Sequence, residues 1–159
     1  VGSALALTLG PAKYDSIVFA GFGEPTLRLG SLLEVCQGLK AGVAKDIPLR
    51  LSTNGLGNVL HGRDLIPELA ASGIMGVTVA LNTACPQQYS ELMRPETAGG
   101  SLDAVCEFVR SCVSCGKLEV ECTVVEHPEV DVSAVQALAK SLGATCRMRT
   151  YHPAEQSAL

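Results

Sequence analysis

The chain has 159 residues, of which 47% are hydrophobic and 4% aromatic; it has no Trp, and its net charge is −4. This length and hydrophobic content suffice for a sizeable core, so we expect a single domain over residues 1–159. The acidic balance gives no basic footprint for nucleic acid, and so few aromatic side chains give no stacking platform for single strands. We therefore expect no nucleic acid partner.

The first nine residues form an apolar run that no basic residue precedes. A signal peptide needs a charged first region and a membrane span needs about 20 apolar residues, so the run fits neither. Because the chain starts without Met, we interpret residues 1–13 as the remnant of an element that continued upstream. No membrane association is expected.

Apolar strands and amphipathic helices alternate along the chain. The predicted strands are short, several of them near-continuous apolar runs typical of strands covered on both faces, and lie at 16–20, 48–52, 76–82, 118–125 and 145–150. Apolar residues at helical spacing predict helices between them, at 29–39, 66–73, 102–109 and 132–142. This alternation predicts an α/β fold with a parallel sheet, either open and doubly wound or curved into a barrel.

The seven cysteines are scattered, and their odd number argues against a secreted disulfide framework. Cys106 falls in register with apolar residues on the inner face of its helix, which predicts a small core residue. Cys112 and Cys115 form a Cys-x-x-Cys pair, but with Cys106 they spread over more than half of the helix circumference. We expect reduced thiols, a cytoplasmic location and no metal ligands in this chain.

The first predicted strand runs into an acidic turn between glycines, Gly21-Phe22-Gly23-Glu24-Pro25. Gly21 and Gly23 can take positive φ and let a ligand approach the backbone. Pro25 biases Glu24 towards an extended conformation and can begin a helix. The pattern predicts a fixed carboxylate among backbone carbonyls, suited to an ammonium group. Alternatively, Glu24 is a first-turn acid that complements a helix dipole.

Polar residues follow four consecutive predicted strands. Because ligands of parallel sheets sit beyond the carboxyl ends of the strands, we expect these residues to share one rim. They are Gly21 to Glu24, Ser52 to Asn54, Asn82 with Thr83, and Glu126. Asn54-Gly55 is also a strong hairpin dipeptide, but the helical pattern that follows favours a strand-to-helix loop. Asn82 could bind a hydroxyl or simply form a turn.

These motifs resemble a known family. Phe22-Gly23-Glu24-Pro25 is similar to the Gly-Gly-Glu-Pro motif of radical S-adenosylmethionine (radical SAM) enzymes. The runs GFGEPTL at 21–27, STNGLGN at 52–58 and HGRD at 61–64 resemble its TatD-associated subgroup, in an order that extends from residue 14 to 151. There are two departures. Phe22 replaces the first of two adjacent glycines, and the Cys-x-x-x-Cys-x-x-Cys signature is missing, since no cysteine precedes Cys36.

The resemblance implies a partial TIM-type (β/α)6 barrel, here lacking its first strand and helix. It implies that the chain is the core of an enzyme that binds S-adenosylmethionine for reductive cleavage to a 5′-deoxyadenosyl radical, on an unknown substrate. The [4Fe-4S] cluster would take its cysteines from upstream, so the chain alone is expected to be inactive. A functional link to a TatD-type hydrolase is also implied. The implied cofactor contacts are Gly21, Phe22, Gly23, Glu24, Pro25, Ser52, Thr53, Asn54, Asn82 and Glu126.

Two other classes stay open. One is a cluster-less, non-catalytic barrel module that binds a nucleotide-like ligand or a partner. The other is a dinucleotide-dependent Rossmann enzyme, which fits less well because Thr26 replaces the third glycine after Gly21 and Gly23, and no acidic residue ends the second strand. Arg94 could reach a substrate carboxylate or phosphate, or could be a solvated loop residue. Arg147, Arg149, Tyr151 and His152 follow or end the last predicted strand, near the open rim, and could face a substrate, but the sequence does not define their roles.

Overall fold

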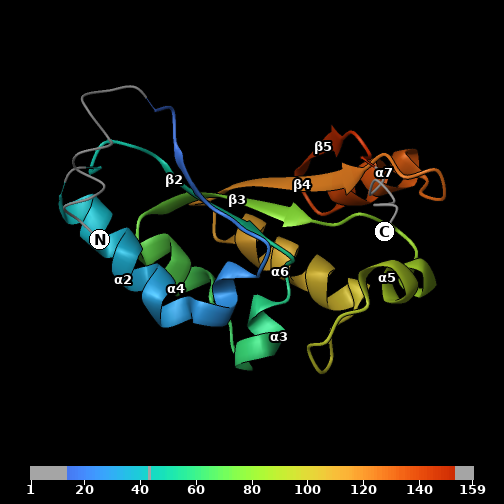
Figure 1. Ribbon diagram of the computed structural model, residues 1–159, viewed down its shortest axis with the longest axis horizontal. Coiled ribbons are helices and arrows are strands. Elements are labelled where there is room, and N and C mark those ends of the chain that lie inside the picture. Colours follow the sequence, from blue (N-terminus) through green and yellow to red (C-terminus); the bar gives the residue numbers. More distant parts are fainter. Residues whose placement is uncertain (1–13, 43, 153–159) are drawn as a thin grey trace, which may run out of the picture.

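The computed structural model describes residues 14–42 and 44–152, which form one parallel β-sheet with helices packed against it (Figure 1). The strands are ordered as they occur in the chain. They are β1 (Ile17–Phe19), β2 (Leu49–Thr53), β3 (Ile74–Ala80), β4 (Glu119–Val125) and β5 (Thr145–Arg149). The predicted α/β fold with five parallel strands is confirmed, and it is compatible with a partial TIM-type barrel. The expected upstream remnant, 1–13, lies outside the described residues.

Helices fill the connections between the strands. They are η1 (Pro25–Arg28), α2 (Leu29–Ala41), α3 (Gly57–His61), α4 (Ile66–Ala71), α5 (Pro86–Met93), α6 (Leu102–Ser114) and α7 (Val132–Ser141). The predicted helices correspond to α2, α4, α6 and α7. The sequence missed α3 and α5 because each is short, and α5 fully buries only Tyr89. In the part of the chain described here, no helix has both the length and the apolar character to cross a membrane.

The two faces of the sheet differ in chemistry because side chains alternate along each strand. On one face, Leu51, Val79 and Val124 are completely buried in the core. The opposite face carries polar side chains such as Arg50 and Thr78, which border open space. The same backbone therefore builds the hydrophobic core on one side and a polar surface on the other.

The expectation that the strands are covered on both faces is wrong for the described residues, because one face of the sheet borders open space. Helices α2, α4 and α6 lie together on one side of the sheet (Figure 1). Strand β3 reads as an apolar run because its uncovered face carries only small side chains or none, at Gly76, Thr78 and Ala80. Cover on one side disfavours the open doubly wound alternative, whose helices flank both faces.

Helix α6 places its cysteines as expected for core residues. Cys106 is 5% exposed, which confirms its prediction as a core residue, and Cys112 is completely buried. Burial raises the pKa of the Cys112 thiol, and of the Cys122 thiol on β4, to about 12. Both thiols therefore stay protonated at neutral pH and act as small apolar side chains.

The loop after β2 requires glycine at position 55. Gly55 has φ +79°, and a Cβ there would lie 2.9 Å from Val79 Cγ1 and 3.0 Å from Val105 Cγ1. We expect Gly55→Ala to lower the free energy of unfolding by about 2 to 4 kcal/mol, since strain and overpacking add. Urea denaturation measures this.

Gly116 provides the matched control, because its φ is +65° but a Cβ there would meet nothing within 4 Å. Gly116→Ala should cost about 1 kcal/mol, from backbone strain alone. Equal losses of stability in the two variants would contradict the packing at Gly55.

Candidate functional site

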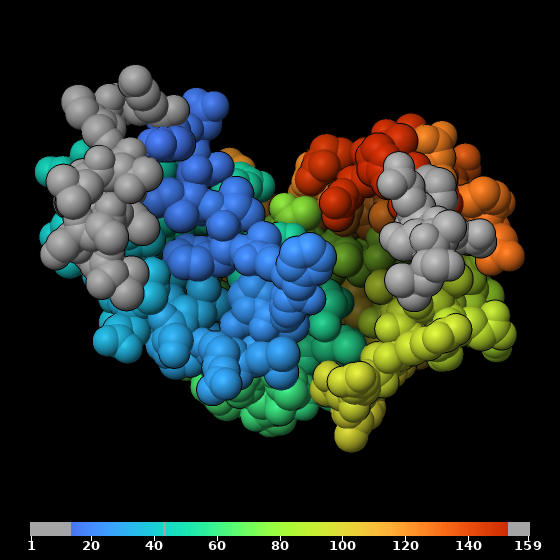
Figure 2. Space-filling model, viewed as in Figure 1, coloured from blue at the N-terminus to red at the C-terminus, as the bar shows by residue number. Residues whose placement is uncertain are grey.

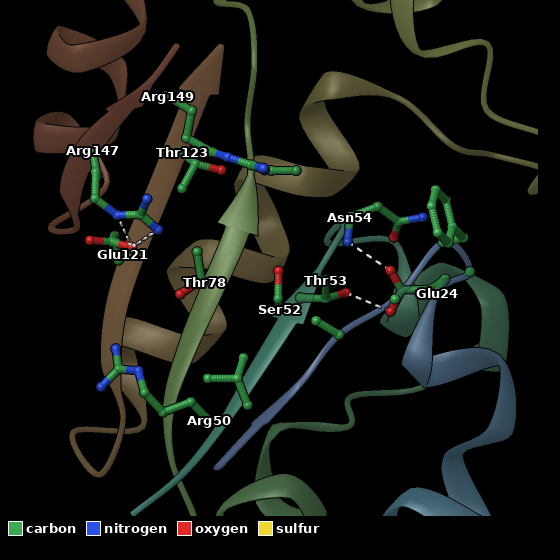
Figure 3. A pocket seen from close by; sticks show the side chains of 16 residues that line it. Glu24, Arg50, Ser52, Thr53, Asn54, Thr78, Glu121, Thr123, Arg147 and Arg149 are labelled. Atoms are coloured by element: carbon green, nitrogen blue, oxygen red, sulfur yellow. Dashed lines mark hydrogen bonds and ion pairs between the residues drawn. The ribbon is translucent and has the colours of Figure 1, made fainter. Parts of the chain in front are cut away.

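The carboxylate of Glu24 joins the loops that follow β1 and β2. Its Oε1 accepts hydrogen bonds from the Thr26 amide at 3.1 Å, the Thr26 hydroxyl at 2.8 Å and the Thr53 hydroxyl at 2.8 Å. Its Oε2 accepts one bond, from the Asn54 amide at 2.7 Å (Figure 3). A carboxylate has about four acceptor positions, two on each oxygen. Oε1 is thus fully used, while Oε2 can still accept another donor.

The local backbone at Glu24 follows the sequence prediction. Glu24 is extended, with φ −96° and ψ 117°, and Pro25 begins η1. The side chain of Glu24 caps this short helix through its bond to the Thr26 amide. Glu24 therefore has a structural role at the start of a helix, as an N-cap and not as the first-turn acid that the alternative interpretation described. This role still leaves one acceptor position of Oε2 for a ligand.

Gly21 and Gly23 provide open space beside the backbone but do not adopt a left-handed conformation. Neither Gly21 nor Gly23 has a positive φ, so the expectation of left-handed backbone there is wrong. A Cβ at Gly23 would meet nothing within 4 Å, and one at Gly21 would meet only the Gly23 amide nitrogen at 3.9 Å. The missing side chains leave open space, so a ligand can approach the backbone.

The loop after β2 is held by local hydrogen bonds. The Asn54 Oδ1 accepts from the Leu56 amide at 2.9 Å, and the Thr53 hydroxyl accepts from the Gly55 amide at 3.1 Å. The chain then enters α3, so the strand-to-helix reading is confirmed and the hairpin alternative is wrong. Thr53 is 4% exposed and its hydroxyl both donates and accepts, so Thr53 positions Glu24.

The uncovered face of the sheet borders a hollow of about 870 Å³. Figure 2 shows the molecule hollowed between the blue segment around β1 and the red segment around β5. Seven of the ten predicted cofactor contacts line this hollow: Gly21, Phe22, Gly23, Glu24, Ser52, Thr53 and Asn54. The structure therefore brings together the motif residues of the first two strands.

The other three predicted contacts lie apart from this lining. Pro25 borders a smaller hollow beside the same turn. Asn82 has a left-handed backbone with φ 58°, and its Nδ2 donates to Met93 Sδ at 3.5 Å, so it acts as a turn residue. Glu126 is exposed, and its amide donates to the Arg149 carbonyl at 2.9 Å.

The predicted site missed the polar face of the strands. The residues that also line the hollow include Arg50, Thr78, Glu121, Thr123, Arg147 and Arg149 (Figure 3). The signal was an alternation of polar and apolar residues, visible in β4 as Glu119, Glu121 and Thr123. Reading the strands as apolar runs concealed this period of two.

The uncovered face of the sheet forms the floor of the hollow, and two ion pairs link neighbouring strands on this face. Arg50 Nη1 lies 2.7 Å from Glu119 Oε2, and Arg147 donates to Glu121 Oε2 at 3.0 and 2.9 Å. Arg50, Gly76 and Glu119 are aligned in neighbouring strands, and a Cβ at Gly76 would lie 2.6 Å from Arg50 Cζ. The bare backbone of β3 thus lets Arg50 reach across to β4.

Comparison with known proteins supports the class that the motifs indicate. No protein-family model matches the chain. A curated relative from Peptoclostridium acidaminophilum, named GTP 3′,8-cyclase, is 31% identical over 126 residues, which cover 76% of this chain and 34% of the relative. The chain thus spans about a third of that protein's length. The relative is a radical SAM enzyme, and the likeness supports a radical SAM-type function at the level of the superfamily.

The two groups implied by that superfamily fit the described residues differently. An ammonium group fits the free acceptor position of Glu24 Oε2 and the open backbone at Gly21 and Gly23. For the iron–sulfur cluster, residues 14–42 and 44–152 contain no group of three His, Cys, Asp or Glu side chains that could hold a metal ion.

The link between Thr53 and Glu24 can be tested by its contribution to stability. Thr53→Val removes the hydroxyl that donates to Glu24 and accepts from Gly55 in a buried position. We expect the free energy of unfolding to fall by about 1 to 3 kcal/mol, because a buried acceptor and donor lose a partner. Thermal and urea unfolding measure the change.

Thr78→Val on the neighbouring strand β3 is the control, since the Thr78 hydroxyl has no hydrogen bond to any of the described residues and the side chain is half-buried. It should change stability by less than about 0.5 kcal/mol. A loss in Thr53→Val no larger than that in Thr78→Val would show that the Thr53 hydroxyl does not hold Glu24.

Proposed function

We propose that this chain is the core of a radical SAM enzyme of the TatD-associated kind and binds S-adenosylmethionine at the carboxyl ends of β1 and β2. The observation that carries the proposal is the fixed carboxylate of Glu24, which keeps one acceptor position free beside the open backbone of Gly21 and Gly23. The motif resemblance and the relative named GTP 3′,8-cyclase support the same class.

The ligand's parts are assigned to residues by their chemistry. The methionyl ammonium would donate to Glu24 Oε2 and to backbone carbonyls of residues 21–23. Ser52 and Asn54 border the same hollow and carry groups that bond a carboxylate or a ribose hydroxyl. Asn82 and Glu126, on the loops after β3 and β4, remain proposed contacts of the ribose and the adenine.

In this reaction class S-adenosylmethionine supplies a carbon-centred radical when it is reductively cleaved at an iron–sulfur cluster. The described residues contribute binding and orientation: Glu24 fixes the amino end of the ligand, and Thr53 fixes Glu24. No cluster ligand set is found among the described residues, so we propose that this chain by itself binds the cofactor without cleaving it. A cytoplasmic location and a functional link to a TatD-type hydrolase complete the proposal.

The second candidate is a cluster-less module that binds a nucleotide-like ligand without catalysis. The observation that favours it is the lack of a metal-holding group in the described part of the chain. Release of 5′-deoxyadenosine by the complete protein, after reconstitution with iron and sulfide and reduction, would exclude this candidate.

Replacement of the Glu24 carboxylate tests cofactor binding. Glu24→Gln removes the charge that attracts the ammonium group, and we expect the affinity for S-adenosylmethionine to fall at least about tenfold, as for loss of a charged hydrogen bond. Isothermal titration calorimetry on the full chain measures this. Glu34→Gln, the same change at an exposed position of α2, should leave the affinity unchanged.

A second variant separates binding from folding, because Glu24 also holds the turn together. Gly23→Val places a side chain into open space, so the fold should persist while the ligand's approach is blocked. Gly30→Val, where a Cβ is equally unobstructed, is the control on α2. Unchanged affinity in both Glu24→Gln and Gly23→Val would refute the proposed site.

A further inference from the structure

Three arginines border the hollow, and two of them are neutralised by neighbouring acids. Arg50 is paired with Glu119 and Arg147 with Glu121, at nitrogen–oxygen distances of 2.7 to 3.0 Å. These pairs tie both guanidinium groups to the floor of the hollow. Because each positive charge is paired with a carboxylate, Arg50 and Arg147 attract an anionic ligand only weakly.

Arg149 is different, because its side chain has no hydrogen-bond or ion-pair partner among the described residues. It is the last residue of β5, and its side chain points into the hollow near Thr123 (Figure 3). The Arg149 carbonyl accepts from the Glu126 amide at 2.9 Å, so its backbone is fixed. The rim therefore presents one uncompensated positive charge from a fixed position.

Arg149 and Glu24 lie on opposite sides of the hollow (Figure 3). Glu24 follows β1 and Arg149 ends β5. These are the two outermost strands, four strand spacings of about 4.8 Å apart along the curved sheet. In an amino acid the ammonium and the carboxylate share one carbon atom. A ligand whose ammonium group is bound at Glu24 therefore keeps its own carboxylate on the Glu24 side, and Arg149 remains free for another molecule.

We infer that Arg149 binds an oxyanion group, a phosphate or a carboxylate, on the substrate that reacts beside the bound cofactor. The inference rests on the proposed function, because it assigns the Glu24 side of the hollow to S-adenosylmethionine. A guanidinium group donates two parallel hydrogen bonds to either oxyanion. The buried Thr123, which lines the same part of the hollow, adds a hydroxyl. The substrate class is thus an anionic small molecule.

Titration of the full chain with two probes, pyrophosphate and glutarate, tests the inference. We expect at least one probe to bind, with an affinity that falls at least about tenfold in Arg149→Gln, since a charged bidentate contact is lost. Arg149→Lys should keep part of the affinity, because the charge remains without the planar fork. The probe that binds more tightly identifies the phosphate or the carboxylate.

Arg110→Gln removes an arginine that is paired with Glu107 at 3.0 Å on α6, away from the hollow, and should leave probe binding unchanged. The affinity of Arg149→Gln for S-adenosylmethionine should equal that of the parent chain. No probe binding, equal probe affinity in Arg149→Gln, or a parallel loss of S-adenosylmethionine affinity would each overturn the inference. Failure of the parent chain to bind S-adenosylmethionine would instead refute the proposed function.

Discussion

The site depends on one carboxylate shared between two loops. Glu24 accepts hydrogen bonds from Thr26 in its own loop and from Thr53 and Asn54 in the loop after β2. His61 Nε2 lies 2.7 Å from the Thr26 carbonyl, so α3 is joined to the same cluster. Because ionised acceptors form the stronger hydrogen bonds, this arrangement fixes the loops that follow two neighbouring strands in one geometry. Oε2 keeps one acceptor position, and Glu24 lines the hollow.

The rest of the sheet divides its two faces between stability and binding. Helices α2, α4 and α6 bury the apolar face, and small residues at Gly76 and Ala80 keep the other face open. Surface ion pairs contribute little to stability. The pairs on the floor of the hollow therefore act mainly by neutralising Arg50 and Arg147, so that these side chains do not attract a charged ligand. They leave Glu24 on one side and Arg149 on the other as the charged groups that face a ligand.

Strong periodic signals in the sequence were sufficient for the framework. The five strands, four main helices and the turn at Glu24 follow from apolar spacing, glycine and proline. The hydrogen-bond partners of Glu24 did not follow, since Thr53 lies 29 residues away and only the parallel pairing of β1 with β2 brings it near. Arg50 was not placed in the site because an apolar-run reading hides which face a side chain occupies, whereas Arg149 was expected near the open rim without a defined role. Asn82 has the left-handed backbone of a turn residue, which was one of its two interpretations and does not exclude the other, a ligand contact.

Everything proposed for this site requires that S-adenosylmethionine binds beside Glu24. Amide chemical shifts of the full chain, followed by two-dimensional nuclear magnetic resonance during titration with this cofactor, test it most directly. We expect the largest changes at Gly21, Gly23 and Asn54. We expect none in a second groove between α4 and α6, which is lined by residues such as Pro67 and Glu107. Saturable changes confined to that groove, or no changes at the two glycines, would contradict it.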